Sequence, residues 1–264
     1  MLKKRLIFSL LYDSGNYMLS RNFSLQKVGD LDWLMNNFDY DSIGHSIDEL
    51  IILNVGRQEK NTALFCKELR KIAGKYFMPI AAGGGILSLE DAANIILSGA
   101  DKLVLNTALF EMPNLVSRLV DTYGSQCIVA SIDYKQCDSS VYINNGSKKS
   151  DNTDLFEAVK YVEALGCGEI YLTSMDNDGT GEGFDLETLK KISLITKLPI
   201  IAYGGGGRYD HFVKVYNECN IEAAATADLF NFMGDGLMET RRFIENSNIP
   251  MAKWDIDFFR NNHG

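Results

Sequence analysis

The chain has 264 residues, of which 46% are hydrophobic and 23% charged, and this composition suits one compact soluble domain. The formal net charge is −9 and no large cluster of Lys and Arg is present, which argues against nucleic acid as a partner. No apolar run reaches the roughly 18 residues of a membrane-spanning helix. The N-terminus starts with basic residues and a short apolar run but lacks a small-residue cleavage site, so we expect a cytoplasmic chain with no membrane partner.

The cysteines and histidines show no pattern of a disulfide framework or a metal site. Five cysteines are dispersed without CxxC spacing, which predicts reduced thiols: Cys66, Cys127, Cys137, Cys167 and Cys219. The three histidines, His45, His211 and His263, share no metal-ligand spacing. We therefore predict neither a bound metal nor another cofactor.

Short apolar segments alternate with longer amphipathic ones along the chain. The apolar segments are rich in Ile, Leu, Val and Ala, as expected for strands buried on both faces of a parallel sheet. We predict strands at 6–12, 49–55, 79–82, 102–106, 127–133, 169–174, 199–203 and 222–226. We predict helices between them, for example at 57–76, 88–98, 112–123, 153–166, 185–197 and 209–219. Eight alternations predict an α/β fold with a single (β/α)8 TIM barrel over residues 1–264.

An internal repeat supports this fold. A shift of about 120 residues superimposes four pairs of segments in the same order, which are 5–13 with 127–135, 48–55 with 168–175, 78–86 with 198–207, and 99–107 with 220–228. The repeat predicts two (βα)4 half-barrels, at about 1–125 and 126–246. A tail at 247–264 follows, and we expect its bulky residues Trp254, Phe258 and Phe259 to pack on the barrel.

Two glycine clusters predict seats for anions. Gly83–Gly85 and Gly204–Gly207 each follow the third strand of a half, where glycine lets backbone N–H groups approach a ligand. The next strand of each half ends before an expected helix N-terminus, a position that favours phosphate. Each cluster alone is equally consistent with a tight loop, but the two together favour a ligand with two anionic ends. The candidate phosphate-binding residues are Gly84, Gly85, Asn106, Thr107, Gly205 and Gly206.

The two halves differ at the positions that carry chemistry. Thr107 can donate to a phosphate, whereas its counterpart Asp228 is an anion that would repel one and can cap the helix itself. Asp133 ends the fifth strand and is the candidate general acid or base, whereas its counterpart is Leu11. Asp13, two residues further on, is a second candidate that the repeat does not align with Asp133.

Charged residues stand at the opposite, amino-terminal ends of four strands. Arg5, Glu49, Lys102 and Glu169 are expected to form a ring of alternating sign at the bottom of the bore. The spacing alone favours a salt-bridged plug over a functional opening.

These residues identify a resemblance to a known family over essentially the whole chain. The chain resembles the cyclase subunit of imidazole glycerol phosphate synthase. The matching segments are KRLI at 4–7, GD at 29–30, IDEL at 47–50, GGGI at 83–86, GADK at 99–102, NT at 106–107, GSQ at 124–126, ID at 132–133, LTSMDNDGT at 172–180, GGGGR at 204–208 and HF at 211–212.

The resemblance implies a glutaminase partner on the amino-terminal face of the barrel. Ammonia released there would pass up the bore, and the four-residue charged ring would be its gate rather than a plug. The resemblance also implies that Thr173 and Asp178 bind substrate and that Asp133 is one of two catalytic aspartates. The other aspartate is Leu11 here, while Leu19, Asn54 and Asp228 also depart from the family pattern.

The departures lead to three hypotheses. A branch of the family with the same leucine is associated with glycosyl amidation in surface-sugar synthesis, where an ATP-dependent sugar amidotransferase converts an acetamido to an acetamidino sugar. The first hypothesis is an ammonia-conducting subunit of that kind, without cyclase chemistry. The second is a genuine cyclase and lyase of histidine biosynthesis, with Asp13 replacing the lost acid, and the third is a noncatalytic scaffold that only binds a glutaminase.

Overall fold

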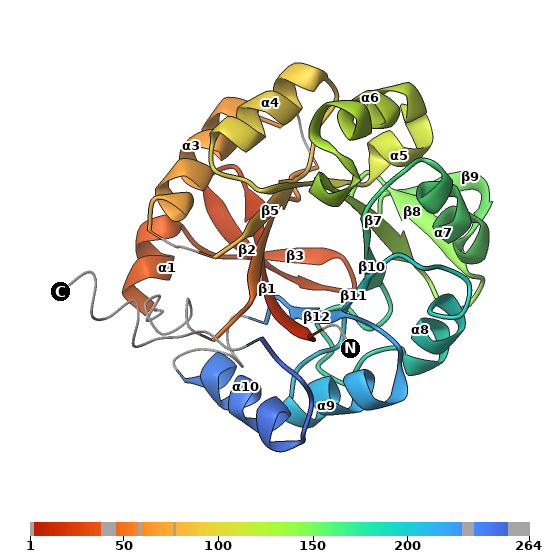
Figure 1. Ribbon diagram of the computed structural model, residues 1–264. Helices are drawn as coiled ribbons and strands as arrows, with labels where there is room; N and C mark the ends of the chain where they lie inside the picture. The colour runs from red at the N-terminus through yellow and green to blue at the C-terminus, as the bar shows by residue number, and fades with distance from the viewer. Residues whose placement is uncertain (1–2, 38–45, 58–59, 76–77, 229–234, 253–264) are drawn as a thin grey trace.

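Eight parallel strands close into a barrel, as the sequence predicts (Figure 1). The computed structural model describes residues 3–37, 46–57, 60–75, 78–228 and 235–252. The barrel strands in ring order are β1 (Arg5–Asp13), β4 (Glu49–Asn54), β5 (Ile80–Gly83), β6 (Lys102–Leu105), β7 (Ile128–Tyr134), β10 (Glu169–Ser174), β11 (Ile200–Tyr203) and β12 (Ala223–Thr226). Pairing of β10 with β7 and of β12 with β1 closes the ring.

Helices surround the barrel and bury their apolar faces against it (Figure 1). They are α1 (Leu31–Asn37), α3 (Thr62–Ala73), α4 (Leu89–Leu97), α5 (Thr107–Glu111), α6 (Pro113–Tyr123), the 3-10 turn η1 (Ser125–Cys127), α7 (Leu155–Ala164), α8 (Leu186–Ile192), α9 (Tyr209–Glu218) and α10 (Gly236–Asn246). The helix predicted at 57–76 begins only at Thr62, because Asn61 caps it by accepting a hydrogen bond from Leu64 N (2.9 Å). The helix predicted at 185–197 ends at Ile192.

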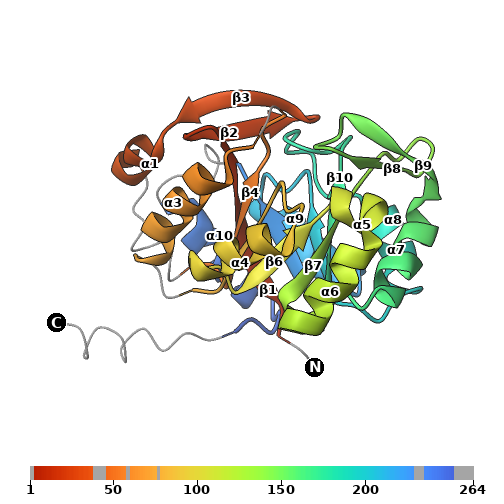
Figure 2. The ribbon, with the colours of Figure 1, turned by 90° about the horizontal axis from the view of Figure 1, so that it is seen from above.

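Two antiparallel hairpins extend the sheet, and the sequence patterns did not predict either. One consists of β2 (Asn16–Arg21) and β3 (Ser24–Gly29) and continues from β1; the other consists of β8 (Ser140–Ile143) and β9 (Lys148–Asp154) and continues from β7. Figure 2 shows both hairpins at the end of the barrel opposite the N-terminus. They therefore stand over the carboxyl ends of the strands, which we call the mouth of the barrel.

Alternation along each strand divides the core into two parts. On β1, Phe8 and Leu10 pack outward against the helices, whereas Ile7 belongs to a separate inner cluster that fills the bore. The buried members of this inner cluster are Ile7, Ile51, Ala81, Val104, Val129, Tyr171, Ile201, Tyr203, Ala223 and Ala225. The bore is thus a packed interior, as is usual in such barrels.

The start of the tail lies against the bottom of the barrel. Ile249 and Met251 are buried, and Met251 pairs with Lys4 just before β1. Trp254, Phe258 and Phe259, which we expected to pack on the barrel, lie outside the described residues. The division into half-barrels near residue 125 also stays a prediction. None of the described helices is long and apolar enough to cross a membrane.

Candidate functional site

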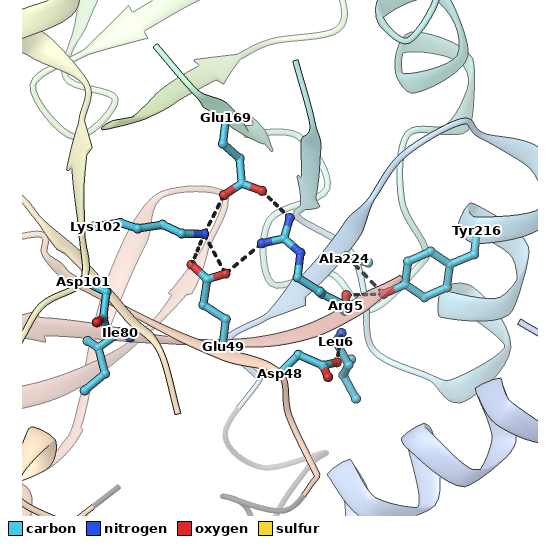
Figure 3. A network of polar contacts seen from close by, with 10 residues as sticks. All are labelled: Arg5, Leu6, Asp48, Glu49, Ile80, Asp101, Lys102, Glu169, Tyr216 and Ala224. Carbon is cyan, nitrogen blue, oxygen red and sulfur yellow. Dashed lines mark hydrogen bonds and ion pairs between the residues drawn. The ribbon is translucent and has the colours of Figure 1, made fainter. Parts of the chain in front are cut away.

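The bottom of the bore is closed by a ring of four charged side chains, which we call the floor ring: Arg5, Glu49, Lys102 and Glu169 (Figure 3). Arg5 Nη1 lies 2.8 Å from Glu49 Oε2, and Arg5 Nη2 also pairs with Glu169. Lys102 Nζ donates to both oxygens of Glu49 at 3.0 Å and to Glu169 Oε2 at 2.9 Å. Each cation bridges both carboxylates, so the signs alternate around the ring as the sequence spacing predicts.

The carboxylates of the floor ring are buried, whereas its cations reach toward the exterior. The side chains of Glu49 and Glu169 are 3% and 7% exposed, but those of Arg5 and Lys102 are 23% and 21% exposed. Burial lowers the pKa of Lys102, yet Glu49 and Glu169 offset this effect and leave the pKa raised above its ordinary value. Lys102 is therefore charged at neutral pH and accessible from the amino-terminal face.

Two tyrosines fill the upper part of the bore. The rings of Tyr171 and Tyr203 stack with centroids 5.0 Å apart, and the Tyr171 hydroxyl is hydrogen-bonded to Ser9 Oγ at 3.0 Å. Burial raises the pKa of both phenols well above the ordinary value, so they stay neutral. Both tyrosines also line the cavity above them, which makes them the boundary between bore and mouth.

A cavity of about 710 Å³ occupies the mouth of the barrel. It brings together seven of the residues predicted for the mouth, because the carboxyl ends of parallel strands converge there. Its lining includes Gly84, Gly85, Asn106, Thr107, Asp133, Thr173 and Asp178. Leu11 and Asn54, two of the positions that depart from the family pattern, line it as well.

Asp133 is a buried carboxyl group at the base of this cavity. Burial raises the pKa of Asp133 to about 7; a hydrogen bond with Thr173 partly opposes this rise, and the charge of Asp178 adds to it. Asn106 Nδ2 donates to Asp133 Oδ2 at 3.3 Å. A group that exchanges its proton near neutral pH is suited to general acid or base chemistry.

Asp178 is held by the first hairpin rather than standing free in the cavity. Its Oδ2 accepts hydrogen bonds from Ser20 Oγ (2.5 Å) and Phe23 N (3.0 Å), while Asn22 N donates to its carbonyl (2.8 Å). Burial raises the pKa of Asp178 as well. The sequence reasoning placed Asp178 in the mouth but missed this anchoring, since the hairpin was not predicted.

The residues predicted for the first phosphate seat lie together in the lining of the large cavity. Gly84 and Gly85 adopt φ angles of +103° and +86°, and a side chain on Gly84 would collide with the Asn54 carbonyl. Thr107 Oγ1 donates to Asn144 Oδ1 (3.1 Å) and accepts from Asn144 N (3.1 Å) at the tip of the second hairpin. Phosphate binding at Thr107 would therefore compete with that tip.

The second predicted seat lies in a separate, smaller cavity of about 200 Å³. Gly205, Gly206, Leu19 and Asp228 line it, together with Asp178, which borders both cavities. Asp228 N donates to Thr226 Oγ1 at 3.2 Å. The helix that we expected to start beside Asp228 would fall in 229–234, outside the described residues.

Asp13 lies against the loop between β4 and α3 and is not among the residues that line the large cavity. Its carboxyl lies against Gly56, where an added Cβ would come within 2.6 Å of Asp13 Oδ1, and it accepts a hydrogen bond from Ser14 Oγ (2.8 Å). The side chain that does face the cavity at the end of β1 is Leu11. β1 and β7 are four strands apart in the ring of eight, so Leu11 and Asp133 lie on opposite sides of the mouth.

Two features of the mouth were missed by the sequence reasoning. Lys60 lines the large cavity, but it fell inside the helix predicted at 57–76 and gave no signal of its own. Asn145, at the tip of the second hairpin, donates to the carbonyls of Val55 (3.1 Å) and Gly56 (2.9 Å) and so ties that hairpin to the far wall of the mouth. Only the three-dimensional contact reveals this role.

Comparison with known proteins shows the family to which the chain belongs. A family model described as histidine biosynthesis protein matches residues 39–234. A Parasynechococcus marenigrum protein with the provisional name imidazole glycerol phosphate synthase subunit hisF2 is 40% identical over 259 residues, which cover 97% of this chain and 96% of the relative. The imidazole glycerol phosphate synthase subunits HisF of Chlorobaculum tepidum (35% identity, 95% and 99% covered) and Clostridium botulinum (34% identity, 93% and 97% covered) are also similar. The chain therefore belongs to the histidine biosynthesis protein family, among the HisF-type subunits of imidazole glycerol phosphate synthase.

Proposed function

We propose that this chain is the barrel subunit of a glutamine amidotransferase complex that conducts ammonia without performing cyclase chemistry. The observation that carries the proposal is the contrast between a complete floor ring and the presence of Leu11 opposite Asp133. A glutaminase subunit docks on the amino-terminal face, where the Arg5 and Lys102 side chains are accessible. The family cyclase relies on two carboxylates that face each other across the mouth. Of these two, this chain retains Asp133.

The ammonia path begins at the floor ring, which must open for each passage. Separation of Lys102 from Glu49 and Glu169 would open the bore without removing any charge from the ring. Ammonia enters as the neutral molecule and meets the inner cluster, whose uppermost members are Tyr171 and Tyr203. The hydrogen-bonded hydroxyls of Tyr171 and Ser9 offer the path a polar step between the apolar bore and the mouth.

At the mouth, a small phosphorylated ligand binds in the large cavity. Gly84, Gly85, Asn106 and Thr107 hold its phosphate, while Thr173 and Asp178 bind its other end. Asp133 serves as the single acid or base, because its raised pKa lets it exchange a proton near neutral pH. Gly205 and Gly206 form a second seat whose affinity for phosphate is reduced by Asp228.

The ammonia is passed to a separate ATP-dependent sugar amidotransferase. That enzyme uses it to convert an acetamido group of a surface sugar to an acetamidino group. Leu11 favours this assignment over cyclase activity, since a leucine can neither donate nor accept a proton.

The second candidate is a genuine cyclase and lyase of histidine biosynthesis. It is favoured by the names of the relatives from Clostridium botulinum and Chlorobaculum tepidum and by the nearly complete mouth. It needs Asp13 to turn from Gly56 into the cavity. The scaffold hypothesis instead requires that the floor ring play no part in ammonia transfer.

A three-component reconstitution tests the proposal. The chain, its glutaminase and the sugar amidotransferase are supplied with glutamine labelled with 15N at the amide, in a buffer that contains unlabelled ammonium. Channelling predicts that the fraction of 15N in the acetamidino product is far above the fraction of 15N in the ammonium of the buffer. A Lys102→Met variant should bring the label down to that share, whereas Lys190→Met, which breaks an exposed ion pair with Glu218, should not. If the product made with the wild-type chain carried no more 15N than the bulk ammonium, the proposal would be refuted.

A further inference from the structure

The mouth cavity has a positively charged wall. Arg57 and Lys60 both come from the loop between β4 and α3, and both line the cavity. Asp178 follows β10, which lies four strands from β4 in the ring and thus on the opposite side. The cavity is therefore polarised, with cations on one wall and the carboxyl groups of Asp133 and Asp178 across from them.

Lys60 is the inner of the two cations. Its Nζ donates to the Asn54 carbonyl at 2.8 Å, the same carbonyl oxygen that an added Cβ on Gly84 would approach within 2.2 Å. Its Cδ lies 2.7 Å from where a Cβ on Gly85 would stand. The lysine side chain therefore runs directly over the two glycines and places its amino group beside Gly84. Arg57, in contrast, is exposed and donates to the Phe23 carbonyl.

The surroundings of Lys60 leave its charge incompletely neutralised. Burial lowers the pKa of Lys60 to about 8, and the nearby carboxylate of Asp13 only partly opposes this effect. The other charged groups around the cavity are Arg57 on the same loop, Asp91 on α4, and the two carboxyl groups across it. Asp91 is engaged at its own helix start, where its Oδ2 accepts from Leu87 N (3.1 Å) and Ser88 Oγ (2.7 Å).

An ammonium group has three N–H donors, and the Asn54 carbonyl takes one of them. We propose that Lys60 is an anion-binding residue of the mouth cavity and donates to a phosphate group that lies against Gly84 and Gly85. The inference rests on the phosphorylated ligand of the proposed function but is independent of the ammonia path. It adds a cation to a seat that otherwise consists of backbone N–H groups, an amide and a hydroxyl.

Titration calorimetry of the full chain with inorganic phosphate tests this role. The Lys60→Met variant should bind phosphate about tenfold more weakly than the wild-type chain, since a charge-assisted hydrogen bond is lost. The Lys60→Arg variant should retain most of the affinity. The matched control is Lys67→Met, which removes a lysine on the exposed face of α3, and it should leave the affinity within a factor of two. Thermal unfolding of each variant establishes that it is folded.

Proton uptake separates a binding amine from a structural one. A free pKa of about 8 means that the amine is largely neutral at pH 8.5, and a bound dianion favours its charged form. Phosphate binding at pH 8.5 should therefore take up protons in the wild-type chain, seen as a heat of binding that depends on the ionisation enthalpy of the buffer. The uptake should vanish in Lys60→Met and in Lys60→Arg.

Three results would overturn the inference, and they differ in how much of the proposed phosphate site they remove. Equal phosphate affinity of the wild-type chain and Lys60→Met, with weaker binding by Thr107→Val, would remove Lys60 from the seat and leave the seat intact. Proton uptake that persists unchanged in Lys60→Met would assign the uptake to another group and would also count against Lys60. No phosphate binding by the wild-type chain would remove the proposed phosphate seat together with Lys60, while the isotope experiment on ammonia would stand unaffected.

Discussion

The floor and the mouth of this barrel are formed by the same strands, yet they differ in how their charged groups are balanced. Arg5 and Leu11 both belong to β1 and both face the bore, six residues apart. At the floor, two cations neutralise two buried carboxylates in a closed ring. At the mouth, Leu11 faces Asp133, a carboxyl group that burial holds near half protonation at neutral pH. One end of the barrel is therefore suited to charge balance and the other to proton exchange.

The largest expected effect comes from breaking the balance of the floor. The Lys102→Met variant leaves Glu49 and Glu169 buried with Arg5 as the remaining cation of the ring. Removal of one partner from a buried ion pair costs about 3 kcal/mol, so urea unfolding should show a loss of that order in the free energy of unfolding. Lys190→Met removes an exposed partner of Glu218 and should cost much less, because solvent screens that pair. Equal losses in the two variants would contradict a balanced, buried ring.

Removal of a charged group from the mouth should raise the free energy of unfolding, whereas removal of Lys102 from the floor lowers it. The pKa of Asp133 is about 7 in the folded chain against an ordinary 3.8, so the folded state retains the proton from about pH 4 to 7 while the unfolded state loses it. The stability that this group contributes is thus complete below pH 4 and lost as the pH rises to 7. Asp133→Asn should therefore stabilise the chain at pH 8 and flatten its stability between pH 4 and 7. Asp121→Asn on the exposed surface of α6 is the control, and a destabilised Asp133→Asn at pH 8 would refute the assignment.

A smaller effect is expected from the hairpin tip that crosses the mouth. Asn145→Gly keeps the left-handed backbone (φ +54°) but removes the two hydrogen bonds to Val55 and Gly56, at a cost of about 1 kcal/mol. Asn145→Ala should cost about 1 kcal/mol more, because alanine is strained at that angle. Asn248→Gly, at φ +60° after α10, is the matched control and should cost nothing measurable. If Asn145→Gly left the free energy of unfolding unchanged, the hydrogen bonds of the tip would not stabilise the mouth.

The barrel was predictable from the sequence because each buried parallel strand is a short apolar run and the repeat fixes their order. All eight strands lie within two residues of their predicted bounds. Both hairpins escaped prediction because their exposed residues, such as Ser24 and Lys149, give no apolar run to detect. The charged floor was also predictable, since a residue at the start of each parallel strand must meet its counterparts at one end of the bore.

The contents of the mouth could be predicted only in part. Asp133, Thr107 and the glycines follow strands, so topology alone brings them together. The direction of Asp13 and the reach of Lys60 depend on loop geometry, which sequence patterns do not encode. The hydrogen bonds of Asn144 and Asn145 join residues about 40 and 90 positions apart in the chain, and no local pattern foretells them.

The most direct test of the difference between floor and mouth is the cyclase reaction with free ammonium. The purified wild-type chain is given ammonium and the histidine-pathway intermediate, and imidazole glycerol phosphate is measured as the product. Because loss of a catalytic carboxylate commonly costs ~10²–10⁴-fold, we expect a rate at least about 100-fold below that of a family cyclase with both aspartates. A rate within about tenfold of that cyclase would contradict the account and establish the mouth as a working cyclase site despite Leu11.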